Sequence, residues 1–103
     1  MTPYSYPGLI GNPSVIHDTI KKVQSLPQFK DVSASEIMGK TRKDEIALAR
    51  HVFRFLLFCE LRNYYRIGRM TKCNHATIMH SIEVVEDFRV TNPKLYACIL
   101  ALV

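Results

Sequence analysis

The sequence has no tryptophan, only four glycines, and no uninterrupted apolar run that approaches the ~20 residues of a membrane-spanning helix. The segment from Met1 to Leu9 contains Pro3 and Pro7 and lacks the basic start of a signal peptide. We therefore expect a cytoplasmic protein with no membrane partner. The composition, 48% hydrophobic and 22% charged, excludes disorder and collagen-like repeats, and 103 residues fit one globular domain.

The three cysteines, Cys59, Cys73 and Cys98, are an odd number without the paired spacing of a disulfide framework or a zinc site. We expect Cys59 and Cys98 to lie in the core and Cys73 to be an exposed thiol. His75 and His80 are five positions apart, about 140° around a helix, which is a poor geometry for a shared metal ion. The sequence therefore predicts no metal site and a reducing environment.

Catalytic and nucleotide-binding motifs are also missing. Gly39-Lys40-Thr41 has the form of the end of a phosphate-binding loop, but the earlier glycine of that motif is replaced by Ala34 and no strand precedes it. Serine, histidine and aspartate are present without a motif that supports nucleophilic catalysis. We expect no enzyme activity, no cofactor and no small-molecule substrate.

The excess positive charge is confined to the middle of the chain. The net charge is +5, from 14 Lys+Arg and 9 Asp+Glu. Residues 1–39 are neutral overall and residues 74–103 carry −1, whereas residues 40–73 carry nine basic and three acidic side chains. A localised positive field attracts a polyanion, and nucleic acid is the usual one. A basic surface that serves only solubility is the alternative.

Helical periodicity dominates the chain, and no segment shows a convincing strand pattern. We expect an all-helical, multi-helix domain over residues 12–103, preceded by a loose N-terminal arm over residues 1–11. Asn12 followed by Pro13 is typical of a helix start, and this first helix should end before Pro27.

The longest helix is predicted over residues 44–61. A shorter helix, which starts with a capping box at Ser33 and ends at Gly39, precedes it. Apolar positions cover several sides of the longest helix, so we expect it to be central in the domain. Arg50 and Arg54, four residues apart, share the stripe that stays polar.

Two further helices are predicted on either side of a polar turn. Asn63 can cap a short helix over residues 64–70, and an amphipathic helix follows over residues 75–89. The inward positions of the second of these helices are Ile78, Ile82, Val85 and Phe88. Thr91-Asn92-Pro93 ends this helix and caps a last helix. The side chains of the last helix that are expected to pack back on the core are Leu95, Tyr96, Ile99, Leu100 and Val103. Tyr64 and Tyr65 are expected to be half-buried structural residues, and stacking on a base or a contact with phosphate is the alternative.

The two helices on either side of the polar turn have the arrangement of a helix-turn-helix. The first is short, the turn has about four residues, and the second helix opens with small polar groups. In that motif the first turns of the second helix enter the major groove of DNA, and the amide groups at its N-terminus can bind a phosphate. The candidates for such contacts are Lys72, Asn74, His75, Thr77 and His80. Packed helical hairpins without a DNA function share this pattern.

Two ordered segments resemble one known family. Residues 39–51 are similar to the basic loop and following helix of the C-terminal DNA-binding domain of the DnaA replication initiators. Downstream, residues 74–81 are similar to the family signature Arg-Asp-His-Thr-Thr-Val-x-His-Ala. The resemblance implies a bacterial or phage-encoded, nucleoid-associated domain that binds double-stranded DNA in replication initiation or its regulation. Because the ATPase motor of the family is absent, such a domain would bind a site without melting it.

The resemblance also implies roles for individual side chains. By position, Arg42 would enter the minor groove, Arg50 would face the DNA, and His75 and Thr77 would approach the major groove. His51 is either a surface histidine or a DNA contact. The expected phosphate contacts, assigned by charge and location alone, are Lys40, Lys43 and Lys72. The full set of expected DNA-binding residues is Lys40, Arg42, Lys43, Arg50, His51, Lys72, Asn74, His75, Ala76, Thr77 and His80.

The chain departs from the family signature at several positions. Asn74 replaces an acidic residue that can accept from a cytosine amino group, and an amide pairs more naturally with adenine. Ala76 replaces the first threonine and leaves only a methyl contact. Lys72-Cys73 replaces Gly-Arg, in a turn about one residue shorter. These departures favour DNA binding in general over binding to the usual initiator box of the family.

A protein-interaction module is the alternative function. Such a domain would keep the fold, lose affinity for DNA, and dock on a replication initiator, another replication protein or a regulatory protein through the apolar N-terminal arm and the last helix. Alanine changes at Arg42, Arg50 and Lys72 separate the two functions, because an interaction module would keep its partner through those changes.

Overall fold

The computed structural model describes residues 13–41 and 43–103. In chain order its elements are α2 (Pro13–Gln24), the 3₁₀ helix η1 (Pro27–Phe29), α3 (Ala34–Met38), α4 (Asp44–Leu61), α5 (Tyr64–Thr71), α6 (His75–Thr91) and α7 (Pro93–Leu100). No strand occurs in the described ranges, so the prediction of an all-helical domain is confirmed. Within those ranges, no helix combines the length and apolar character needed to cross a membrane.

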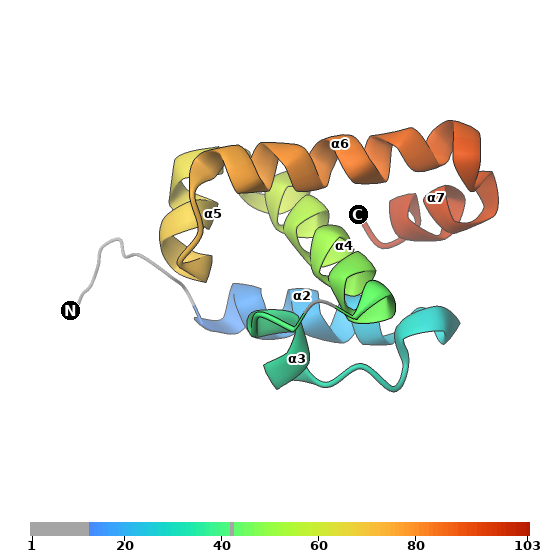
Figure 1. Cartoon of the computed structure of the whole chain (residues 1–103), viewed down its shortest axis with the longest axis horizontal. Coiled ribbons are helices and arrows are strands. Elements are labelled where there is room, and N and C mark those ends of the chain that lie inside the picture. The colour runs from blue at the N-terminus through green and yellow to red at the C-terminus, as the bar shows by residue number, and fades with distance from the viewer. Residues whose placement is uncertain (1–12, 42) are drawn as a thin grey trace.

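Helix α4 is the centre of the domain. It runs obliquely between α6 on one side and α2 with α3 on the other (Figure 1), and it packs against all three as well as α5. The prediction of a central helix buried on several sides is confirmed. Its buried side chains are Ile46, Ala49, Val52, Phe53, Phe55, Leu56 and Leu57.

The connection from α2 to α3 contains an element that the sequence did not predict. Pro27 opens η1, and this single 3₁₀ turn places the ring of Phe29 in the core with no exposed surface. The Gln24 amide donates to the carbonyl oxygen of Val32 at 2.9 Å and closes the segment. A run of three residues is too short to show helical periodicity, which explains why the sequence pattern missed it. The predicted start of α2 at Asn12 and the arm over residues 1–11 lie outside the described residues.

Helix α3 begins and ends as predicted. The Ser33 hydroxyl accepts from the Glu36 amide, and the Glu36 carboxylate accepts from the Ser33 amide, so both halves of the capping box are present. The hydrogen bond from the Ser33 backbone amide to the carboxylate is the main cause that lowers the pKa of Glu36. The backbone leaves the helix at Gly39, and the connector to α4 starts there.

Helices α5 and α6 pack against each other across a tight turn. The Asn63 side chain accepts from the Arg66 amide at 3.0 Å and caps α5, as predicted. Helix α5 ends at Lys72, whose φ of 59° turns the chain back toward α6. The approach is close, because a Cβ added at Gly68 would lie 2.6 Å from the carbonyl oxygen of Cys73.

The C-terminal helices are only partly as predicted. On α6 the four expected inward positions are buried or half-buried against the core. On α7 Leu95 and Ile99 are buried, but the predictions that Leu100 and Cys98 are covered are wrong, since both are exposed. Each is one position, about 100°, away from Ile99 and so points off the core. Val103 is also exposed, because it lies beyond the end of the helix.

Candidate nucleic-acid interface

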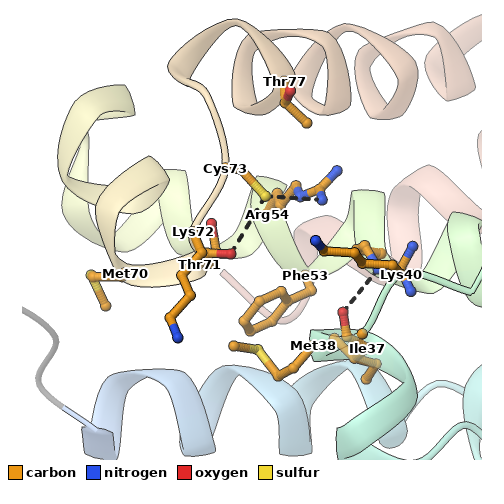
Figure 2. Close-up of a pocket in the computed structure, with 12 residues that line it drawn as sticks. Ile37, Met38, Lys40, Phe53, Arg54, Met70, Thr71, Lys72, Cys73 and Thr77 are labelled. Carbon is orange, nitrogen blue, oxygen red and sulfur yellow. Dashed lines mark hydrogen bonds between the residues drawn. The ribbon is translucent and has the colours of Figure 1, made fainter.

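Two basic segments that are far apart in the sequence meet at one pocket of about 780 Å³. The connector between α3 and α4 contributes Lys40, and the turn before α6 contributes Lys72, while Thr77 lines the pocket from the first turn of α6 (Figure 2). Among the described residues that line it, four carry Lys or Arg side chains and none is acidic. These four are Lys40, Arg50, Arg54 and Lys72.

Arg50 holds the connector against α4. Its Nε donates to the carbonyl oxygen of Ile37 at 3.0 Å, one terminal nitrogen donates to the carbonyl of Glu36 at 2.7 Å, and the other to the carbonyl of Thr41 at 3.0 Å. The guanidinium therefore bonds two carbonyl groups in the last turn of α3 and one in the connector. Burial, with the nearby charge of Arg54, lowers the pKa of Arg50.

Arg54 connects three elements, and it was not among the residues expected at the site. One terminal nitrogen donates to the Ser81 hydroxyl on α6 at 3.0 Å, and the other lies 3.4 Å from the Cys73 sulfur in the turn. Cys73 is half-buried by this contact, so its prediction as an exposed thiol is wrong. Ser81 is fully buried, and it is the polar centre of the contact between α4 and α6.

His51 belongs to the same buried network. Its Nδ1 lies 2.8 Å from the Ser81 oxygen. Since that oxygen accepts from Arg54, its one hydrogen is available to His51, which fits a neutral imidazole protonated at Nε2. Burial first, and then the charges of Arg54, His80 and Arg50, lower the pKa of His51 to about 4. The ring also meets His80 edge-on, with 5.7 Å between centroids.

The start of α6 presents the residues expected to read bases. The Asn74 oxygen accepts from the Ala76 amide at 2.8 Å and caps the helix, which occupies one acceptor position of that amide side chain. His75 is half-buried beneath Tyr65, with ring centroids 4.4 Å apart. Ala76 and His80 are exposed, and Thr77 is half-buried at the pocket.

The two adjacent tyrosines differ in exposure. Tyr64 is half-buried and stacks on Phe58 with 4.6 Å between centroids, as expected. Tyr65 is 60% exposed, so its prediction as a half-buried residue is wrong. It lies on the face of α5 that continues onto the start of α6, beside His75.

The rest of the basic connector is exposed where it is described. Lys40 and Lys43 are both exposed, and the carbonyl oxygen of Lys43 accepts from the Ala47 amide at 2.8 Å to begin α4. Arg42 lies outside the described residues. Within the described part of the chain, no three His, Cys, Asp or Glu side chains gather in a way that could hold a metal ion.

The sequence contained a partial signal for Arg54. Its spacing of four residues from Arg50 placed both on one stripe of α4, which the structure turns toward the pocket. The contacts of Arg54 join positions 19 and 27 residues apart, and no local pattern predicts such pairs. Ser81 gave no signal, because serine is an exposed residue in most proteins.

Comparisons with known proteins agree with this geometry. Residues 18–85 match the family model described as the bacterial dnaA protein helix-turn-helix. The chromosomal replication initiator protein DnaA of Pseudothermotoga lettingae is 33% identical over 72 residues, which is 65% of this chain. DnaA 1 of Chlamydia pneumoniae is 30% identical over 71 residues, or 66% of the chain. The chain spans about 15% of the length of each of these relatives. No solved structure gives a significant match.

Proposed function

Because the chain belongs to the family of bacterial DnaA helix-turn-helix domains, we propose that it binds double-stranded DNA with the first turns of α6 in the major groove. The observation that carries this function is the convergence of the connector and the turn on one side of the N-terminus of α6. Lys40 and Lys72 reach the same pocket there, beside Thr77. A duplex that enters along α6 would meet both segments with its phosphates.

Within this function the side chains divide into three roles. Phosphate contacts come from Lys40, Lys43 and Lys72, which are exposed cations on two adjacent segments. Base contacts come from the start of α6, at Asn74, His75, Ala76, Thr77 and His80. By the resemblance alone, Arg42 is the proposed minor-groove contact, because a guanidinium suits the narrow groove of A·T sequences.

Two residues from the expected set act through other groups rather than on DNA. Arg50 donates to three backbone carbonyls, so its role is to hold the connector that carries Lys40 in place. His51 is half-buried and bonded to Ser81, so it supports the angle between α4 and α6.

The relatives are chromosomal replication initiators, and this chain resembles only their helix-turn-helix segment. The domain therefore marks a DNA site in replication initiation or its regulation and does no catalysis of its own. Its partners are duplex DNA and, at a shared site, a replication initiator that it assists or competes with. In this proposal the protein acts at the nucleoid of a bacterium or of a phage-infected cell.

Fluorescence anisotropy with labelled duplexes tests the proposal. The protein is titrated onto a random duplex and onto one with the initiator box of the family, from ~50 to ~200 mM salt. Binding should weaken steeply with salt on both duplexes. Thr77→Ala should reduce the preference for the best site by roughly 1–3 kcal/mol, because a base contact is lost. An equal loss on every duplex would remove Thr77 from the base-reading group, and no binding at low salt would overturn the function.

A further inference from the structure

Arg54 is the cation of the pocket with no role in the functions assigned so far. It comes from the middle of α4, about three turns away from the connector, and it is half-buried. Figure 2 shows it beside Cys73, between Thr77 on α6 and Lys40 on the connector. Its guanidinium therefore lies where the two basic segments meet, at the opening that faces the start of α6.

The hydrogen bonds of Arg54 leave donors for a ligand. A guanidinium has five N–H groups. The contacts with the Ser81 hydroxyl and the Cys73 sulfur take two of them, one on each terminal nitrogen. These two bonds fix the plane of the group and direct its other donors. A guanidinium held in this way has little conformational entropy left to lose when it binds an anion.

The surroundings of Arg54 are electrostatically unbalanced. Lys40, Arg50 and Lys72 line the same pocket, and no acidic residue is among its described lining. The charge of Arg54 also contributes to the lowered pKa values of Arg50 and His51. Such mutual repulsion is relieved by a bound anion, and the pocket gains an electrostatic driving force for one.

Cys73 occupies a position at which the chain departs from the family signature. In the signature that residues 74–81 resemble, an arginine stands directly before the acidic residue, and this chain has Cys73 at that place. Arg54 lies with a terminal nitrogen 3.4 Å from the Cys73 sulfur. The guanidinium that the turn lacks is thus supplied next to the same position by α4.

We propose that Arg54 contacts a phosphate diester of the duplex backbone in the pocket between the connector and the turn, in place of an arginine at position 73. This inference rests on the proposed DNA-binding function and assigns a contact residue that the resemblance does not supply. Lys72 lines the same pocket and adds its positive charge beside this phosphate position.

Two variants test this assignment: Arg54→Gln alone, and Arg54→Gln combined with Cys73→Arg. Their DNA binding is measured by fluorescence anisotropy on one duplex across ~50 to ~200 mM salt. The substituted side chain keeps an amide donor toward Ser81 but has no charge. We expect affinity to fall roughly tenfold or more, since a charged hydrogen bond is lost, and the salt slope to fall by about one unit. Adding Cys73→Arg to Arg54→Gln should restore both, because it returns a guanidinium to the pocket.

Two matched controls separate a DNA contact from a structural role. Ser81→Ala removes the hydrogen bond from Arg54 and keeps its charge, so the salt slope should stay at the wild-type value. Arg89→Ala removes one positive charge from the last turn of α6, far from the pocket, and should leave affinity within about twofold. Thermal melting and circular dichroism check that each variant is folded.

The outcomes decide between the inference and the function it rests on. If Arg54→Gln is folded and binds DNA with wild-type affinity and salt slope, the inference is overturned and the proposed function stands. If Ser81→Ala lowers the salt slope as much as Arg54→Gln, or Cys73→Arg restores nothing, Arg54 is only a structural connection. If the wild-type protein binds no duplex at low salt, the proposed function fails and the inference fails with it.

Discussion

At the scale of single residues, Arg62 and Lys72 occupy positions where glycine is the usual residue. Each ends a helix in the left-handed conformation, with φ of 55° and 59°. That conformation costs a residue with a Cβ roughly 1–2 kcal/mol. At the pocket, the positive charge of Lys72 gives a functional reason to keep a lysine at this strained position.

Lys72→Gly should therefore make the folded domain more stable and its binding to DNA weaker. The relief of backbone strain exceeds the extra entropy of glycine in the unfolded chain, so the free energy of unfolding should rise by up to about 1 kcal/mol. The salt slope of DNA binding should fall by about one unit, because a phosphate contact is lost. Arg62→Gly is the matched control, with the same backbone change outside the described pocket lining, and it should leave DNA binding unchanged. Urea unfolding and anisotropy measure the two effects, and wild-type DNA binding by the Lys72 variant would contradict the account.

His51 makes stability depend on pH in a defined direction. Its pKa is about 4 in the folded protein and 6.5 in the unfolded chain, so the unfolded chain binds more protons between these values. The free energy of unfolding should therefore fall as the pH falls from 6.5 toward 4, and His51 adds no slope above 6.5. Urea unfolding on both sides of pH 6.5, compared with His51→Gln, isolates this contribution. The same slope in both proteins would show that His51 is not the buried neutral group described here.

At the scale of elements, the contact between α5 and the turn depends on Gly68. A Cβ there would lie 2.6 Å from the backbone carbonyl of Cys73, and a backbone atom has little freedom to move away. Alanine favours a helix by roughly 1 kcal/mol over glycine. The steric clash outweighs that preference, because α5 and the turn would have to separate.

Gly68→Ala should destabilise the domain by roughly 1–3 kcal/mol, which is the cost of overpacking. Affinity for DNA should fall as well, since Lys72 and the start of α6 would move away from the connector. Denaturant unfolding and anisotropy on the same duplex test both effects. A variant as stable as the wild type would show that the close approach of α5 to the turn is not a feature of the native state.

Most helix limits could be predicted from local chemistry. The capping box at Ser33 and the caps at Asn63 and Asn92 are short-range signals, and each lies at a helix start in the structure. The exposure of Cys98 and Leu100 could not be predicted in this way, because hydrophobicity does not tell which side of a short terminal helix is covered.

The candidate site likewise contains some residues that the sequence predicts and one contact that it does not. Lys40, Lys72 and Thr77 could be assigned from charge, position and resemblance, and they line one pocket. The contact of Arg54 with Ser81 joins α4 to α6 across 27 positions, and it follows from the packing of two helices rather than from any segment.

At the scale of the whole molecule, charge is distributed along α6. The connector and the turn place cations near its first residues, whereas Glu83, Glu86 and Asp87 are exposed on its later turns. Tyr96 on α7 donates to Glu86 at 2.9 Å, so the acidic end is also the end that packs against α7. From this distribution we expect a duplex to be attracted to the first turns of α6 and repelled from its later turns, so that the proposed entry into the groove would be from the N-terminal end of the helix.

The most direct test of this account is the change of backbone amide NMR shifts when a duplex is added to the labelled protein. The account predicts large changes in Lys40, Thr41 and residues 72–77, and none on the outer side of α7. Changes concentrated on α7, with none around the pocket, would contradict DNA binding through α6.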